Sequence, residues 1–226
     1  ADYVNGAFEN GSVAIAYDSR IKSDKFAKEA AAVLAANGIK VYIYSELMPT
    51  PMLSWAVREL KCQAGIVITA SHNPAKYNGY KVYGEDGCQI TLDVANTVIG
   101  KINAVEMFGG AKVVDFEDGI KSGKIEYIKQ DVIDKYLDKV AQQGVHTDLV
   151  ADSGLKVVYT PLNGTGNKPV RAILKKIGIK EVTVVPEQEN PDGNFPTCPY
   201  PNPEIKEAMA LGMEYAKKCN ADLLLA

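Results

Sequence analysis

The run Gly65-Ile66-Val67-Ile68-Thr69-Ala70-Ser71-His72-Asn73-Pro74 joins an unbroken apolar stretch to a cluster of polar residues. A short apolar run rich in β-branched residues is typical of a strand that is buried on both faces, as strands of parallel sheets are. Ligands of open α/β sheets bind beyond the carboxyl ends of such strands. The run therefore predicts a buried parallel strand over 65–70 that presents functional side chains from Ser71 onward.

The residues before this run alternate between strand and helix patterns. Ser23 can cap the first helix, and Gly38 ends it in a position that favours glycine. Thr50 as N-cap with Pro51 at the first helical position opens the second helix. The predicted order is strand 13–17, helix 23–37, strand 41–44, helix 50–60 and strand 65–70. This order implies a parallel sheet with helices on both faces.

The pattern returns in the second half of the chain, after a Gly- and charge-rich segment over 109–123 that is predicted to be a loop near a domain end. Further predictions are a hairpin at 80–87, helices over 91–105, 131–143, 169–177 and 202–215, and strands over 156–160, 182–185 and 221–226, the last of them buried. We expect an α/β fold of two domains, 1–128 and 129–226, each with a mixed or parallel sheet and helices on both faces.

Composition limits the partners and the location of the protein. The formal net charge of −3 provides no basic field for nucleic acid or an anionic membrane, and no apolar run approaches ~20 residues. The four cysteines form no Cys-x-x-Cys pair, which favours reduced thiols in a cytoplasmic protein. Two histidines argue against a zinc site of Cys and His. A catalytic metal would then have oxygen ligands, which favours Mg²⁺.

The loop after the deciding strand gathers groups that suit anion chemistry. It offers the Ser71 hydroxyl, the His72 imidazole and the lysine Lys81 just beyond, while Asn78-Gly79 permits a positive φ. A polar turn without function is the alternative reading from the residues alone. A serine hydrolase is disfavoured because no Gly-x-Ser-x-Gly elbow surrounds Ser71. Asn163-Gly164-Thr165-Gly166 looks like a phosphate cradle but lacks a P-loop lysine, so we predict a tight turn there.

The loop also carries a family resemblance. Thr69-Ala70-Ser71-His72-Asn73-Pro74, followed by Asn78-Gly79 and Lys81, resembles the phosphoserine-loop signature of the α-D-phosphohexomutases. Further segments are similar to that family: Tyr17-Asp18-Ser19-Arg20, Pro49-Thr50-Pro51, Asn190–Pro196 and Pro201–Glu204. The chain as a whole resembles the N-terminal portion of the phosphoglucomutase/phosphomannomutase family.

This resemblance implies an isomerase that works as an intramolecular phosphotransferase. Phosphorylated Ser71 would give its phosphoryl group to a hexose monophosphate, and the hexose bisphosphate would reorient and return the other phosphate. Interconversion of glucose 1-phosphate and glucose 6-phosphate is the expected reaction. A phosphomannomutase, a phosphopentomutase or a non-catalytic relative that binds sugar phosphate are the alternatives.

The resemblance also implies roles for individual residues. Ser71, Lys81 and Arg20 are expected to be catalytic, with the two cations neutralising the phosphoryl group. His72 and Asn73 are expected to bind phosphate or shape the loop. Mg²⁺ is expected to contact a phosphate oxygen on Ser71, with its carboxylate ligands in the sequence that would follow Ala226. We therefore expect the chain to be a fragment that is inactive by itself.

Overall fold

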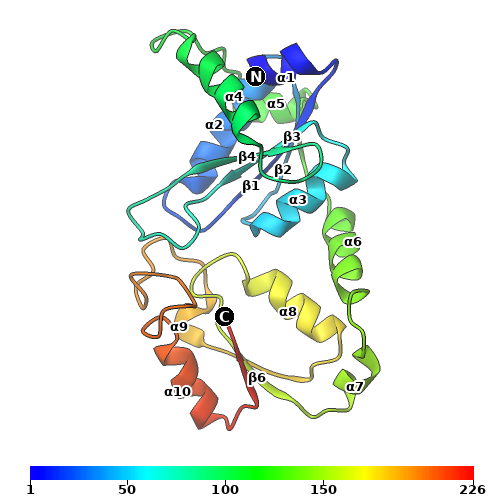
Figure 1. Ribbon diagram of the computed structural model, residues 1–226, viewed down its shortest axis with the longest axis vertical. Helices are drawn as coiled ribbons and strands as arrows, with labels where there is room; N and C mark the ends of the chain where they lie inside the picture. Colours follow the sequence, from blue (N-terminus) through cyan, green and yellow to red (C-terminus); the bar gives the residue numbers. More distant parts are fainter. The chain divides into compact units, whose positions relative to one another are not determined.

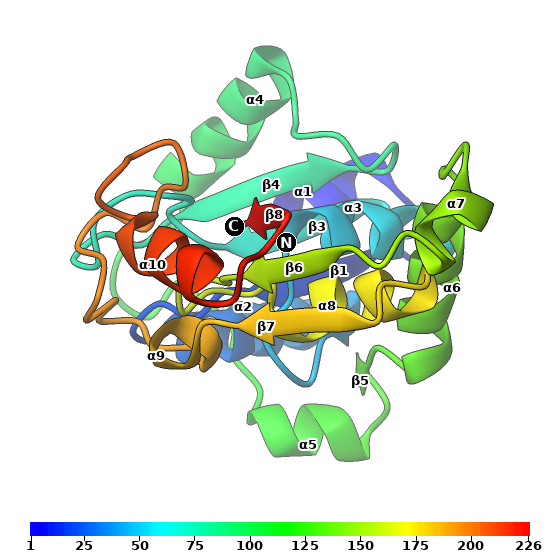
Figure 2. The same cartoon turned by 90° about the horizontal axis from the view of Figure 1, so that it is seen from below.

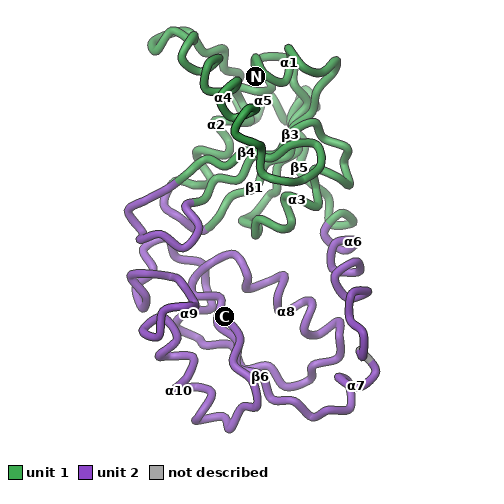
Figure 3. Tube along the Cα trace, viewed as in Figure 1, with its two compact units in different colours: residues 1–18, 22–69, 79–132 green, residues 19–21, 70–78, 133–226 purple. Residues whose placement is uncertain are grey.

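A computed structural model describes residues 1–146 and 148–226, and Figure 1 shows its helices and strands. The chain divides into two compact units, which Figure 3 colours separately. Unit 1 comprises residues 1–18, 22–69 and 79–132, and unit 2 comprises residues 19–21, 70–78 and 133–226. Both units place parallel strands next to helices, so the predicted α/β class is confirmed.

Unit 1 is built on a mixed sheet with the strand order β4-β3-β1-β2-β5. Its strands are β1 (Ser12–Tyr17), β2 (Lys40–Ile43), β3 (Ala64–Ile68), β4 (Tyr80–Gly84) and β5 (Ile125–Tyr127). The central strand β1 pairs in parallel with β2 and β3, and β5 extends the sheet in parallel beyond β2. In contrast, β4 pairs antiparallel with β3 because it returns directly through the loop that carries Ser71.

Two helices cover opposite faces of this sheet. Val13, Ile15 and Tyr17 of β1 share a core with α2 (Ser23–Ala36). On the other face, α3 (Thr50–Glu59) lies so close to β3 that a Cβ at Gly65 would come within 2.5 Å of the Val57 side chain. Helices α1 (Asp2–Ala7), α4 (Leu92–Asn103) and α5 (Phe116–Lys121) complete the unit. Helices on both faces of the sheet are thus confirmed.

Several helix starts differ from the predicted ones. Ser23 is not the N-cap of α2: Lys22 takes that position with a φ of 67°, and the Ser23 hydroxyl instead donates to Asp18 at 2.7 Å. The N-cap of α3 is Pro49 and not the predicted Thr50, which is the first helical residue. Segment 109–123 is not simply a loop, because Asp115 caps α5 by accepting from the Asp118 N–H at 3.1 Å.

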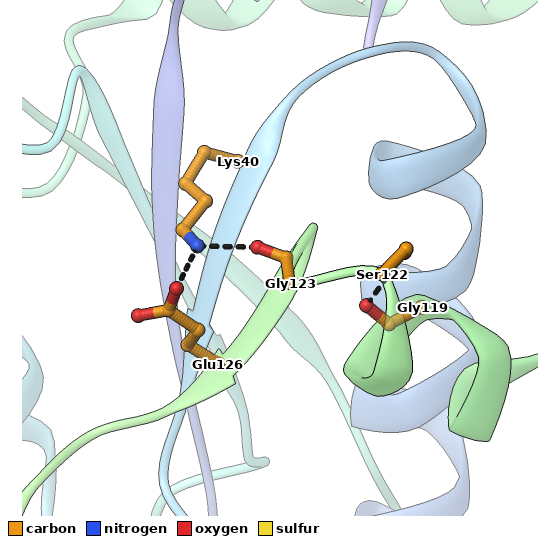
Figure 4. Close-up of polar contacts among 5 residues, drawn as sticks. All are labelled: Lys40, Gly119, Ser122, Gly123 and Glu126. Carbon is orange, nitrogen blue, oxygen red and sulfur yellow. Dashed lines mark hydrogen bonds and ion pairs between the residues drawn. The ribbon is translucent and has the colours of Figure 1, made fainter.

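The edge strand β5 is tied down by polar contacts that Figure 4 shows. Lys40 on β2 donates to the Gly123 carbonyl and pairs with the Glu126 carboxylate. The Ser122 hydroxyl donates to the Gly119 carbonyl at 3.0 Å and so closes the last turn of α5. These contacts explain how three residues with one buried side chain hold the edge of the sheet.

Unit 2 has a second parallel sheet, with the order β7-β6-β8, that is visible from below in Figure 2. Its strands are β6 (Lys156–Tyr159), β7 (Glu181–Val184) and β8 (Leu223–Leu225). Its helices are α7 (Thr147–Ala151), α8 (Asn167–Lys176), α9 (Pro186–Glu189), α10 (Ala210–Lys218) and most of α6 (Gln130–Ala141). Leu223 is 44% exposed, so the prediction that β8 is a buried strand is wrong for this edge strand.

The helix predicted over 202–215 also begins later than expected, at Ala210. Before it, the chain forms turns: the Ile205 N–H donates to the Asn202 carbonyl, and the Ala208 N–H donates to the Ile205 carbonyl. The Asn202 side chain accepts from the Glu204 N–H at 3.0 Å and competes with regular helix formation.

Among the described residues, no helix combines the length and the apolar content that a membrane crossing requires.

Candidate active site

The candidate site begins where β3 ends. Thr69 and Ala70 are buried, the Thr69 N–H donates to the Gly79 carbonyl at 3.0 Å, and Ser71 is exposed. Ser71 has a φ of 55°, in the left-handed region that residues other than glycine adopt at a cost of ~1–2 kcal/mol. Such a conformation persists only when surrounding contacts enforce it.

Those contacts come from Arg20, which is 3% exposed. Its Nη2 donates to the Ser71 carbonyl at 2.7 Å and to the Asn73 carbonyl at 2.5 Å. Its Nη1 donates to the Pro74 carbonyl at 2.9 Å and to the Tyr77 carbonyl at 3.0 Å. One guanidinium therefore gathers carbonyl groups from the whole length of the loop.

This arrangement gives Arg20 a use that the sequence does not predict. Each terminal nitrogen of a guanidinium carries two N–H bonds, and each nitrogen here has two carbonyl acceptors. The planar fork that suits phosphate oxygens is thus engaged with the loop backbone. Direct contact of Arg20 with a phosphate stays a prediction.

The loop adds turns of its own. The Asn73 N–H donates to the Ala70 carbonyl at 3.1 Å, and the Tyr77 N–H donates to the Pro74 carbonyl at 3.0 Å. The Asn78 side chain donates to the Ile21 carbonyl at 3.4 Å, next to Arg20 in the chain. The backbone of Asn73 therefore shapes the loop both as a donor and as an acceptor.

Residues 190–196, which are distant in the sequence, pack against Arg20. The Phe195 ring faces the guanidinium, with 5.4 Å between the guanidinium carbon and the ring centroid, and Phe195 is 5% exposed. A Cβ at Gly193 would lie 2.6 Å from both the Ser19 carbonyl oxygen and the Ile21 nitrogen. Only glycine allows such a close approach of two backbones.

This segment is itself anchored by Asn163, which is 3% exposed. The Asn163 side chain donates to the Asn190 carbonyl at 2.8 Å and to the Glu187 carbonyl at 3.2 Å. Its main-chain carbonyl accepts from the Asp192 N–H at 3.0 Å. Asn163 also has a φ of 55° and lies inside a tight turn, which the Gly164 N–H closes by donating to the Pro161 carbonyl at 2.8 Å.

The two remaining predicted site residues, Lys81 and His72, belong to different units. Lys81 is on β4, opposite Val67 in the antiparallel register, and is partly exposed. It belongs to unit 1, whereas Ser71 and the exposed His72 belong to unit 2. The predicted meeting of Lys81 and Ser71 at one phosphate therefore stays a prediction, as does phosphate binding by His72.

A metal site was tested against the donor groups of the chain. Within the part of the chain that the structure describes, no three His, Cys, Asp or Glu side chains converge as metal ligands. Mg²⁺ is normally held by carboxylate and phosphate oxygens. The described residues do not fit a carboxylate-bound Mg²⁺.

Sequence reasoning missed the roles of Gly193 and Phe195. The resemblance marked their segment, Asn190–Pro196, as a family loop but gave it no partner. The available signal was a glycine between two polar residues and two positions before an aromatic one, because a glycine can mark a close backbone approach. Its partner, Arg20, lies more than a hundred residues away in the sequence, so pattern alone could not find it.

Comparisons with known proteins agree with this architecture. Residues 1–108 match the family model of phosphoglucomutase/phosphomannomutase, alpha/beta/alpha domain I, and residues 134–226 match that of domain II. A phosphoglucomutase of Staphylococcus saprophyticus is 38% identical over 226 residues. A phosphoribomutase of Saccharomyces cerevisiae is 37% identical over 246 residues. Both alignments cover all of this chain, but the chain spans 40% and 39% of the lengths of these relatives.

Structural similarity extends over nearly the whole chain. A crystal structure from Thermus thermophilus, of a protein provisionally named phosphomannomutase, matches with a TM-score of 0.78 at 25% identity. The match covers 94% of this chain and 44% of that one. Two consecutive family domains and the similar arrangement of their sheets confirm the resemblance carried by the Ser71 loop. The chain belongs to the phosphoglucomutase/phosphomannomutase family of phosphohexomutases.

Proposed function

We propose that Ser71 carries the phosphoryl group of a phosphomutase that interconverts glucose 1-phosphate and glucose 6-phosphate. The observation that carries the proposal is the exposed Ser71, held at a positive φ directly after the buried strand β3. Strain of this kind is concentrated at functional sites, and the carboxyl ends of parallel strands are where α/β proteins bind ligands. Family membership supplies the reaction class.

The reaction needs two transfers through one serine oxygen. Phosphorylated Ser71 gives its phosphoryl group to the free hydroxyl of the sugar monophosphate: the bond from phosphorus to the Ser71 oxygen breaks as the bond to the sugar oxygen forms, and the proton of the sugar hydroxyl is balanced by the one that the freed Ser71 oxygen takes up. The resulting bisphosphate then returns its other phosphoryl group to the Ser71 oxygen, so the phosphoserine is regenerated. A phosphoserine carries about −1.5 to −2 charges at pH 7. The ammonium of Lys81 is proposed to offset that charge during transfer.

The fold does not identify the sugar, so the choice of glucose phosphates is part of our proposal. The relatives include proteins named phosphoglucomutase and phosphoribomutase, which act on different sugars by their names. Glucose phosphates are our first choice, and mannose and pentose phosphates are the alternatives to be assayed beside them. Mg²⁺ stays a prediction from the resemblance.

The test uses the full-length protein of which this chain is a part. Incubation with glucose 1,6-bisphosphate followed by peptide mass spectrometry should place the phosphate on Ser71. The variant Ser71→Ala should lose turnover, whereas Ser153→Ala, which removes an exposed hydroxyl elsewhere in unit 2, should keep it. Label on another residue, or normal turnover in Ser71→Ala, would refute the assignment.

The same assay separates the alternatives. Sugar-phosphate binding by the wild-type protein without turnover of any sugar would identify a non-catalytic relative. The 226-residue chain assayed alone is expected to give no turnover, because it spans about two fifths of the length of its curated relatives. Positioning of a substrate for in-line transfer depends on contacts throughout an active site.

A further inference from the structure

We propose that Arg20 is a positioning residue, which fixes the backbone of the Ser71 loop through four carbonyl groups and is itself held in place by Phe195. This inference rests on the proposed function of Ser71 and assigns the part of the chain that keeps Ser71 in position. Residues 70–78 form the serine loop.

The first support is the geometry of the guanidinium. Its hydrogen bonds reach carbonyls of four residues between Ser71 and Tyr77, at distances of 2.5 to 3.0 Å. Charge-assisted hydrogen bonds are stronger than neutral ones, and burial strengthens them further. Lysine cannot replace this arrangement, because its ammonium has three donors around one point and no planar fork.

The second support is the conformation that these bonds enforce. The φ of 55° at Ser71 is unfavourable for a serine, so a loose loop would leave it. Nη2 binds the carbonyl of Ser71 itself, at 2.7 Å. The loop's own turns, at Asn73 and Tyr77, contribute hydrogen bonds that close short rings but do not anchor the loop to another segment. Arg20 provides that anchor.

The third support is the set of contacts that residues 190–196 make with Arg20 and its neighbours. The Phe195 ring lies over the guanidinium, where the face of an aromatic ring attracts a cation. Gly193 lets the 190–196 backbone touch the backbone on either side of Arg20. Asn163 fixes the far side of this segment through the Asn190 carbonyl and the Asp192 N–H. A chain of contacts therefore runs from Asn163 through Phe195 and Arg20 to Ser71.

For the reaction, the consequence is that Arg20 controls the position of the Ser71 oxygen. Transfer in both directions requires the Ser71 oxygen to meet two different sugar hydroxyl groups in line, and small misplacements cost large factors in rate. A positioning role acts on the loop whether or not Ser71 is phosphorylated. A direct phosphate ligand would order the loop only when the phosphate is present, and this difference provides the test.

The experiment measures hydrogen–deuterium exchange of the dephosphorylated full-length protein by mass spectrometry, with turnover in parallel. Arg20→Lys should raise the exchange rate of serine-loop peptides at least ~10-fold while peptides from β1 and β3 stay protected. Its kcat should fall by ~100-fold, the scale of a small misplacement. Phe195→Leu should show smaller changes in the same direction. Arg171→Lys, an exposed arginine of unit 2, is the matched control and should change neither readout.

Three results would overturn the proposal. The first is wild-type loop exchange in Arg20→Lys with reduced turnover, which would make Arg20 a phosphate ligand. The second is unchanged loop exchange in a folded Phe195→Leu variant, which remains measurable if Arg20→Lys does not fold. The third is faster exchange throughout unit 2 in both variants, which would show a general structural role. If the wild-type protein lacks turnover, the proposed function fails, while the exchange data still decide the role of Arg20.

Discussion

At the scale of single residues, burial separates side chains that are chemically identical. Cys62 is 1% exposed, and burial raises the pKa of its thiol to about 11, against a weak opposing effect of its hydrogen bond with Ser12. Cys88 is exposed. Because the thiolate is the nucleophile and the reagent must reach it, iodoacetamide at pH 8 should modify the exposed Cys88 much faster than the buried Cys62. The rise of the Cys62 pKa from 9.0 to about 11 lowers its thiolate fraction by about 100-fold.

Timed alkylation followed by peptide mass spectrometry checks this prediction, with the same reaction in concentrated urea as the control. Denaturation should remove the difference between the two cysteines. Equal rates in the folded chain would show that the region around Cys62 opens readily.

The same thiol makes stability depend on pH. Its pKa is 9.0 as the ordinary value and about 11 in the folded protein, so the folded state holds the proton more tightly than the unfolded state. The corresponding stability is fully present below pH 9 and is lost as the pH rises toward 11. Cys62→Ala should therefore weaken the fall in unfolding free energy between pH 8 and 10.5 by ~1–2 kcal/mol. Urea titrations at both pH values measure it, and an unchanged slope would contradict the assignment.

At the scale of elements, β3 and α3 depend on a residue without a side chain. A Cβ at Gly65 would meet Val57 at 2.5 Å, Leu53 at 3.1 Å and Tyr83 at 3.3 Å. Gly65→Ala should therefore force α3 away from the sheet and lower the unfolding free energy by ~1–3 kcal/mol, the usual cost of overpacking. Gly100→Ala is the control, because a Cβ there meets nothing within 4 Å on the exposed helix α4. Equal stability of both variants by urea unfolding would show that the contact relaxes freely.

Elements with strong patterns could be predicted from the sequence, and those fixed by tertiary contacts could not. Strands β1 and β3 are mostly apolar runs that are buried almost throughout, so their composition predicts their burial. In contrast, β5 has three residues, one of them buried, and depends on contacts made by Lys40. The helix predicted from residue 202 begins only at Ala210, because Asn202 forms turns with the residues that follow it.

In the candidate site, too, some features follow from the local sequence and others depend on tertiary contacts. The place of Ser71 after a buried strand follows from local sequence. The use of Arg20 does not, because an arginine at a strand end can face a phosphate or a neighbouring loop. The choice is set here by the path of residues 71–77, whose carbonyls turn toward the guanidinium. Tertiary placement of this kind has no periodic signature in a single sequence.

At the scale of the whole molecule, the compact units are not continuous in sequence. Residues 19–21 and 70–78 belong to unit 2 although unit 1 surrounds them in the chain. The boundary predicted at residue 128 stays a prediction, and a single cut cannot reproduce this division. Residues 19–21, which follow closely after β1, contact Gly193 and Phe195 within unit 2.

This interleaving leads to a prediction for a shortened chain of residues 1–132. Its sheet should remain folded, because the core around β1, β2, β3 and β5 uses residues within that range. The serine loop should exchange its amide hydrogens faster than in the 226-residue chain, because Phe195 and Gly193 are missing from their places beside Arg20. The increase should be smaller than the one caused by Arg20→Lys, since the four guanidinium bonds lie within residues 20–77 and can still form.

Hydrogen–deuterium exchange of the two chains, compared peptide by peptide, measures the effect. Protected β3 peptides with a faster serine loop would show that residues 133–226 stabilise the serine loop. Equal loop exchange in both chains would mean that Arg20 holds the loop without help from Phe195. Rapid exchange of the β3 peptides themselves would show that unit 1 depends on the rest of the chain, and the interleaved segments would then be part of one cooperative fold.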